Sequence, residues 1–207
     1  MAGNAACLKG TVLDVGCGDM PYRAMILEKN SRVQNYLGLD LEVNHFSRNA
    51  LPDLTWEGKV IPLPDNSVDS ALATELLEHC PDPAAVAREI YRVLKPEGTL
   101  LFTVPFIWPL HEVPHDYSRF TPFSLTKILE NAGFTATSFT MLGGWDASLA
   151  QVMGLWVARR PGLNRVIRRL LRIAFKPVIW WLLKADTRPE KFEESQLFTG
   201  IGGVARK

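Results

Sequence analysis

The sequence has few cysteines and no long apolar run. Its three cysteines, Cys7, Cys17 and Cys80, form no Cys-x-x-Cys pair, which is typical of proteins in a reducing compartment. The longest apolar run near the C-terminus, PVIWWLL, is far shorter than the roughly 20 residues that a membrane-spanning helix needs. The first ten residues, MAGNAACLKG, lack the basic start and apolar core of a signal peptide. We therefore expect a cytoplasmic protein.

Net charge is also small, but it is unevenly distributed. The whole chain carries +1 over 207 residues. Residues 159–191 hold ten Lys and Arg against two Asp and Glu, so this segment is strongly basic and the remainder is acidic. The length predicts one domain, residues 1–207, with room for a substantial core. Within it, we expect a basic amphipathic helical insertion at residues 147–191.

Short β-branched and apolar runs alternate with helical segments along the chain. Strands are predicted at residues 11–16, 34–41, 54–58, 67–74, 99–106, 135–142 and within 197–207. Helices are predicted at residues 21–30, 82–98 and 121–134, with Asp82 and Thr121 as N-caps followed by proline. The alternation predicts an α/β, Rossmann-like domain. We expect a seven-stranded, mostly parallel sheet with an antiparallel last strand and the helical insertion between strands six and seven.

A glycine turn follows the first predicted strand, in VLDVGCGDM. Gly16 and Gly18 let the backbone approach a ligand without a Cβ in the way. A dinucleotide site needs a third glycine, and this chain has Pro21 there instead. Asp14 would also repel a phosphate. The turn therefore disfavours a dehydrogenase and favours a ligand that carries an amino group.

Two more acids follow the next two strands. Asp40 ends the second strand, where a carboxylate can accept hydrogen bonds from ribose hydroxyls. Glu57 ends the third strand beside Gly58. Three acids beside a glycine turn suit a ligand with a ribose, a base and an ammonium group, and no phosphates.

Several motifs, in order, resemble those of class I S-adenosylmethionine-dependent methyltransferases, closest to the type-11 methyltransferase domain family. They are VLDVGCG, YLGLD and the long segment IPLPDNSVDSALATELLEHCPDPAAVAREIYRVLKPEGTLLFTVP, and the resemblance covers roughly residues 12–134. It implies methyl transfer and a site for S-adenosylmethionine made of Asp14, Gly16, Cys17, Gly18, Asp40, Leu41, Glu57, Gly58, Thr74 and Glu75.

The resemblance also implies which part of the cofactor each residue would contact. Gly16 and Gly18 would contact its methionine part through their backbone, and Asp14 would hold its amino end. Asp40 would bind the ribose, and Glu57 would face the adenine amino group. The structural alternatives are that Asp14 caps the glycine turn, that Asp40 is an ordinary strand-end acid and that Glu57 is a solvated one.

A loop rich in titratable groups, HEVPHDYSRFTPFSL, follows the fifth strand. Its candidates for substrate contact or proton removal are His115, then His111, with Asp116 and Tyr117 beside them. The alternative is a structural network in which Asp116, Arg119 and Tyr117 hold the loop. Glu78 and His79, in ELLEHCPDP, are further acid–base candidates; the alternative, which we favour, is a structural role in which His79 bonds backbone near the Pro81 turn. No metal ligand is predicted.

Residues 163–184 form a cationic amphipathic helix with two tryptophans. The pattern favours either contact with a membrane surface or a cap over the substrate site, and it disfavours nucleic-acid binding. The expected acceptor is a small molecule or a lipid- or sugar-linked group. The alternative function is a catalytically silent, membrane-associated methyltransferase-like scaffold or partner subunit.

Overall fold

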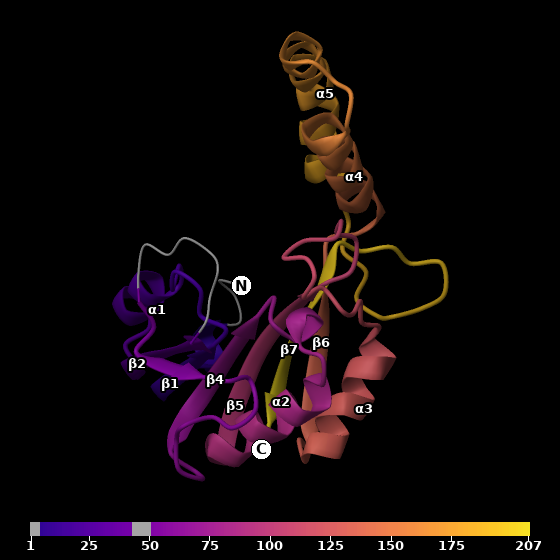
Figure 1. Cartoon of the computed structure of the whole chain (residues 1–207). Coiled ribbons are helices and arrows are strands. Elements are labelled where there is room, and N and C mark those ends of the chain that lie inside the picture. The colour runs from indigo at the N-terminus through magenta and orange to yellow at the C-terminus, as the bar shows by residue number, and fades with distance from the viewer. Residues whose placement is uncertain (1–4, 43–50) are drawn as a thin grey trace. The chain divides into compact units, whose positions relative to one another are not determined.

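A seven-stranded sheet with the strand order β3-β2-β1-β4-β5-β7-β6 runs through the computed structural model, which describes residues 5–42 and 51–207 (Figure 1). Its strands are β1 (Gly10–Val15), β2 (Val33–Leu41), β3 (Leu54–Trp56), β4 (Val68–Thr74), β5 (Leu94–Pro105), β6 (Ala136–Leu142) and β7 (Gly200–Arg206). The predicted α/β fold with seven strands is confirmed.

The first five strands are parallel and the last one is not. β1 pairs in parallel with β2 and β4, β2 with β3, and β4 with β5. In β7 the order of the hydrogen bonds is reversed: the Thr199 N–H donates to Leu142 O, whereas Arg206 O accepts from the Thr135 N–H. As the residue numbers rise along β7, those of the paired residues in β6 fall. The last strand is therefore antiparallel, as predicted. The carboxyl ends of β1 to β5 therefore meet at one edge of the sheet.

Within the described residues, five α-helices accompany these strands. They are α1 (Arg23–Lys29), α2 (Pro83–Val93), α3 (Pro122–Ala132), α4 (Trp145–Arg159) and α5 (Arg165–Ala185), with short 3₁₀ helices at Ala5–Cys7 and Leu77–His79. The predicted caps are confirmed: Asp82 accepts from Ala85 N–H at 2.9 Å, and Thr121 forms a capping box with Ser124. Both α4 and α5 lie between β6 and β7 in the chain, where the insertion was predicted.

Two predicted boundaries are wrong. β5 begins at Leu94 and not at Thr99, because Leu94 is buried and pairs with Val68, and Pro96 cannot supply the N–H that a longer helix needs. Pro21 lies before α1, whose N-cap is Tyr22.

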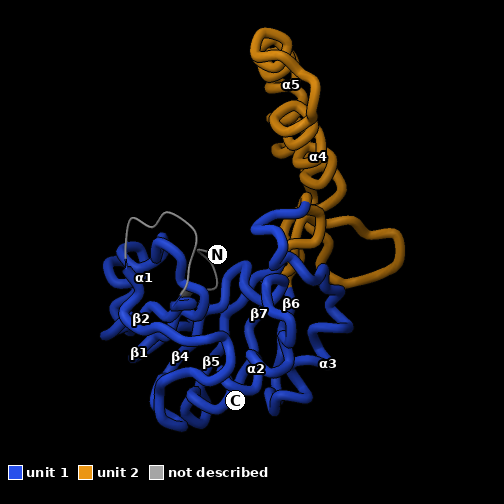
Figure 2. The backbone as a smooth tube through the Cα atoms, in the orientation of Figure 1, with its two compact units in different colours: residues 1–104, 110–139, 202–207 blue, residues 105–109, 140–201 orange. Residues whose placement is uncertain are grey.

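The chain divides into two compact units (Figure 2). Unit 1 comprises the described parts of residues 1–104, 110–139 and 202–207. Its core on one side of the sheet joins neighbouring strands to α1 and includes Val12, Tyr36, Leu72, Leu101 and Ile26. Unit 2 comprises residues 105–109 and 140–201, and in it α4 packs against α5. α5 is continuous through Pro177. None of the helices in the described residues is long and apolar enough to cross a membrane.

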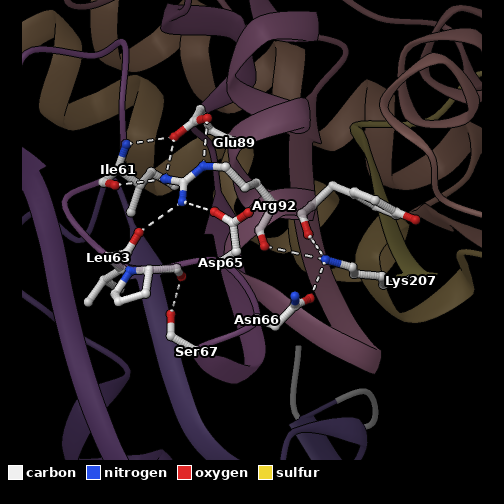
Figure 3. Close-up of polar contacts among 10 residues, drawn as sticks. Ile61, Leu63, Asp65, Asn66, Ser67, Glu89, Arg92 and Lys207 are labelled. Atoms are coloured by element: carbon white, nitrogen blue, oxygen red, sulfur yellow. Dashed lines mark hydrogen bonds and ion pairs between the residues drawn. The ribbon is translucent and has the colours of Figure 1, made fainter.

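Arg92 of α2 fixes the segment that leads into β4 (Figure 3). Its guanidinium donates to Glu89 Oε1 and Oε2, to Asp65 Oδ1 at 2.7 Å and to the carbonyls of Ile61 and Leu63 at 2.9 Å each. Lys207 completes this region by donating to Asn66 and to Tyr91 O. One planar side chain thus satisfies five acceptors, which holds residues 61–65 against α2.

Candidate functional site

The turn after β1 is held open by its glycines. Gly16 and Gly18 have φ values of +72° and +50°, and a side chain at Gly16 would meet Leu76 Cδ1 at 2.7 Å. At Gly18 a Cβ would meet no atom of the described residues within 4 Å. Leu39 O accepts both the Gly16 and the Cys17 N–H groups, so the turn is tied to β2. The Cys17 side chain is buried in the core, and therefore only its backbone faces the turn.

Asp14 lies at the base of this turn and is 1% exposed. Tyr36 Oη donates a short hydrogen bond to its Oδ2. Its Oδ1 is buried and has no hydrogen-bond partner among the described residues. Burial raises the pKa of Asp14 to about 7, although the Tyr36 hydrogen bond opposes the shift. A buried carboxylate oxygen without a donor is costly, so this atom is suited to a ligand that brings a donor or a positive charge.

Asp40 links two neighbouring strand ends. Its Oδ2 accepts the Gly18 N–H at 2.8 Å and its Oδ1 accepts the Leu41 N–H at 2.7 Å. Leu41 lies opposite Trp56 of β3, and its side chain approaches Gly58, whose φ is +77°. Glu57 is exposed beyond the end of β3.

The end of β4 is the next part of the same edge. Glu75 follows Thr74 and has a φ of +51°, a conformation that costs a non-glycine residue on the order of 1–3 kcal/mol. Its N–H donates to Thr103 O at 2.9 Å. The pKa of Tyr22, half-buried near these residues, is raised by desolvation and by the Glu75 and Asp14 carboxyls. Strained backbone of this kind is concentrated at functional sites.

In the loop that follows β5 and begins at His111, here named the histidine loop, Asp116 is bound to Arg119 and to His111. Arg119 donates to both Asp116 oxygens, at 2.5 and 2.8 Å, and His111 Nδ1 lies 3.2 Å from Asp116 Oδ2. Arg119 lowers the pKa of Asp116 well below its usual range. His115 does not contact Asp116 through any hydrogen bond found in the described residues; its Nδ1 lies 3.2 Å from Tyr117 Oη, and both side chains are exposed.

The 3₁₀ helix Leu77–His79 carries two residues that the sequence interpretation treated as structural. Glu78 is fully buried, and burial raises its pKa to about 8. Its carbonyl accepts the Tyr117 N–H at 2.8 Å, which joins this helix to the histidine loop. His79 Nδ1 lies 2.8 Å from His115 O, and its ring stacks edge-on against His111 at 4.6 Å.

The structure therefore brings the predicted residues together in two groups. The β1, β2 and β4 ends gather Asp14, Gly16, Gly18, Asp40, Thr74 and Glu75, and the loop after β5 gathers His111, His115, Asp116 and Tyr117. Sequence reasoning missed Tyr36, Tyr22 and the buried state of Glu78. No local pattern marks Tyr36, because it reaches Asp14 from 22 residues away on the neighbouring strand.

Comparison with known proteins agrees with this architecture. Residues 13–102 match the model of a family described as a methyltransferase domain. A probable S-adenosylmethionine-dependent methyltransferase of Mycolicibacterium smegmatis is 31% identical over 144 residues, covering 62% of this chain and 53% of the relative. A demethylmenaquinone methyltransferase of Listeria welshimeri is 35% identical over 103 residues, covering 44% of each.

A crystal structure of a SAM-dependent methyltransferase from Archaeoglobus fulgidus matches 100% of this chain and 90% of its own, with a TM-score of 0.60 at 18% identity. At this identity the likeness shows the fold alone. The chain spans about half the length of the two curated relatives.

The seven-stranded sheet and this structural match show that the chain shares its fold with the Archaeoglobus fulgidus S-adenosylmethionine-dependent methyltransferase. The match of residues 13–102 to a methyltransferase-domain model agrees with the resemblance found in the sequence, and the Mycolicibacterium smegmatis relative is named as S-adenosylmethionine-dependent.

Proposed function

We propose that the protein transfers a methyl group from S-adenosylmethionine to a small-molecule or lipid-linked acceptor. The observation that carries the proposal is the pairing of a buried, partnerless oxygen, Asp14 Oδ1, with a glycine turn that leaves open space at Gly18. An ammonium group or a bound water would supply the missing donor. A second carboxylate, Asp40, lies across the turn.

The residues present fit this cofactor. Asp14 would hold its amino end, Gly16, Cys17 and Gly18 would approach it through their backbone, and Asp40 would accept hydroxyl hydrogen bonds. At the outer strand ends, Glu57 would face the base beside Leu41 and Gly58, with Thr74 and Glu75 on the other side. When bound, the cofactor supplies an electrophilic methyl group on a sulfonium, and the protein's part is to orient the acceptor and exclude water.

We propose that His115 removes the proton from the methyl acceptor. His111 is the second candidate for this role. His115 is exposed and contacts the Tyr117 hydroxyl, so both can reach a bound substrate. Asp116 is held by Arg119 and stays ionised, which suits it to orienting His111 and makes it a poor base.

A thermal-shift series tests the cofactor assignment. S-adenosylmethionine and its demethylated product should each raise the melting temperature, and NAD should not. A ligand at 100 times its dissociation constant adds about 2.7 kcal/mol of stability. A larger shift with NAD than with either sulfur compound would overturn the proposal.

We also propose that unit 2 rests on an anionic membrane surface and that the acceptor is lipid-linked. One side of α5 is partly or fully covered, and its residues recur at helical spacing: Arg168, Leu171, Phe175, Ile179 and Leu182. The Trp156 and Phe175 rings, from α4 and α5, lie 6.0 Å apart. The opposite side of α5 stays exposed although it is apolar, with Val166 at 68%, Ile173 at 64% and Trp181 at 61%. The apolar stripe of the amphipathic helix predicted at residues 163–184 thus lies mostly on the exposed side, since Val166, Ile167, Leu170 and Val178 are all exposed.

Charge and aromatic content favour lipid as the occupant of this exposed side. Arg165, Arg169 and Arg172 follow one another at helical spacing next to the apolar stripe and are exposed. A basic stripe beside exposed tryptophans is typical of helices that lie in a membrane interface. Within unit 2, residues 106–109 and α4 also line a wide, open and mainly apolar depression of the surface, which would suit contact with an acyl or prenyl chain. The Listeria relative is named as a methyltransferase of demethylmenaquinone.

Vesicle flotation tests the membrane proposal. The protein should float with vesicles that contain phosphatidylglycerol, less so as salt rises, and not with neutral phosphatidylcholine vesicles. Replacing Arg165, Arg169 and Arg172 by Gln should weaken binding by about 100-fold, because each basic residue near an anionic surface contributes about 1 kcal/mol. The matched control replaces Lys29, Arg88 and Lys127, exposed cations of unit 1, by Gln. Equal loss in both triple variants, or no flotation at low salt, would refute the proposal.

A further inference from the structure

Three potential metal ligands converge where the 3₁₀ helix after β4 meets the loop after β5. Glu78, His79 and His111 each offer one ligand atom, and these atoms all lie within 4.8 Å of one another. His79 Nε2 is 3.8 Å from Glu78 Oε1. Bonds of about 2.0–2.2 Å to a common ion place neighbouring donors about 3–4 Å apart, so a small contraction of the cluster would complete such a site.

Glu78 points to a missing partner. Its side chain is 0% exposed, and neither carboxylate oxygen has a hydrogen-bond donor in the parts of the chain that the structure describes. The 3.8 Å separation from His79 is too long for a hydrogen bond. A proton on Glu78 would not give the carboxyl group a hydrogen-bonding partner, because the resulting O–H would lack an acceptor. Buried carboxyl groups are normally paired or bound to a metal.

The two histidines are oriented as metal ligands usually are. His79 Nδ1 lies 2.8 Å from the carbonyl of His115, a bond in which Nδ1 must be the donor. His111 Nδ1 lies 3.2 Å from Asp116 Oδ2, again an acceptor. With the proton on Nδ1, each neutral ring has its lone pair on Nε2. Metal-binding histidines nearly always donate their other ring N–H to a carbonyl or a carboxylate in this way.

The supporting residues also fix the site from both chain segments. Arg119 holds Asp116 by two hydrogen bonds, and the Glu78 carbonyl accepts N–H groups from Tyr117 and Ser118. These bonds hold the ligands of the 3₁₀ helix and of the loop in fixed positions relative to each other. A preorganised set of ligands binds a cation more tightly than a mobile set.

We propose that Glu78, His79 and His111 bind a divalent first-row cation, with Zn²⁺ and Mn²⁺ as the best matches to two imidazoles and one carboxylate. Asp116 is a positioning residue for His111. This replaces the sequence-based prediction of no metal ligand. Three protein ligands leave a coordination position for an oxygen of another molecule. That this molecule is the methyl acceptor rests on the proposed function; the metal site itself does not.

The test uses the full chain, freed of metal with a chelator, and adds Zn²⁺, Mn²⁺ or Mg²⁺ alone. We expect one equivalent of Zn²⁺ or Mn²⁺ by elemental analysis after dialysis, together with a saturable rise in melting temperature. Glu78→Gln and His111→Ala should each lose both signals. Asp116→Asn should weaken the affinity by about 10–100-fold, as outer-sphere variants of metal sites do.

His115→Ala is the matched control, because this histidine lies in the same loop but outside the cluster. It should bind the cation like the unaltered protein. Binding that survives in Glu78→Gln, or that is lost equally in His115→Ala, would overturn the proposal, as would the absence of stoichiometric metal. The S-adenosylmethionine thermal shift, measured on the same samples, separates the two proposals: it should persist in Glu78→Gln, and its absence would refute the cofactor assignment alone.

Discussion

Asp40 accepts the backbone N–H of Gly18 at 2.8 Å, across 22 residues of sequence. This bond ties the end of β2 to the glycine turn after β1. One carboxylate thus shapes the turn and also faces the edge of the sheet where the cofactor is proposed to bind.

Replacing Asp40 should therefore have two effects. In Asp40→Ala the Gly18 N–H loses its acceptor, and the free protein should lose about 1–3 kcal/mol of stability. The thermal shift with S-adenosylmethionine should also fall to a small fraction of the unaltered protein's shift. Glu130→Gln, an exposed acid on α3, is the charge-matched control and should keep the full shift. A full shift in Asp40→Ala would argue that Asp40 is only an ordinary strand-end acid.

Asp14 should make stability depend on pH in an unusual direction. Its pKa in the folded chain is about 7, above the usual aspartate value of 3.8, so between these values the folded state holds a proton that the unfolded state has released. The free energy of unfolding should fall as pH rises from about 4 to 7, by at most about 4 kcal/mol. The groups that face Asp14 are Tyr36, Asp40 and Tyr22.

Urea unfolding at several pH values measures this effect. In Asp14→Asn the Tyr36 hydroxyl can still donate to the amide oxygen, but the titration is gone, so the decline between pH 4 and 7 should be shallower. Identical profiles for the two proteins would show that Asp14 does not titrate in this range.

Arg92→Lys should destabilise unit 1 although it keeps the charge. A lysine cannot reach Glu89, Asp65 and the two carbonyls at once. Because hydrogen bonds to charged groups contribute about 1.5–3 kcal/mol each, a net loss of about 2–3 kcal/mol is expected in urea unfolding. Arg88→Lys on the same helix, whose contact with Asp82 is exposed and 3.8 Å long, should change stability by less than about 0.5 kcal/mol.

His115→Ala should lower turnover by about 100-fold or more if His115 removes the acceptor's proton. The measurement is release of demethylated cofactor with a panel of quinone, glycolipid and small-molecule acceptors. The S-adenosylmethionine thermal shift should not change, since no cofactor contact is assigned to this residue. Tyr117→Phe keeps the ring and removes only the hydroxyl, so it reports the part played by that contact. Unaltered turnover in His115→Ala would refute this role for His115.

The features that sequence alone determined are local ones. The caps at Asp82 and Thr121, the glycine turn at residues 16–18 and the alternation of strands and helices each depend on residues within a few positions of one another. Together with ordered family motifs, such signals were enough for the fold, and they predicted the cofactor class and the edge of the sheet where we propose the site.

Tertiary structure decided the rest, because those contacts join residues that no local pattern connects. Tyr36 reaches Asp14 only because β2 pairs with β1. The loop sequence placed Asp116 next to His115, but the fold directs its carboxylate to His111 and Arg119. A structural role was the favoured interpretation of Glu78 and His79, and only the burial of Glu78 beside His79 and His111 assembles the cluster that we propose as a metal site. Burial and missing partners are properties of packing, which spacing along a chain does not encode.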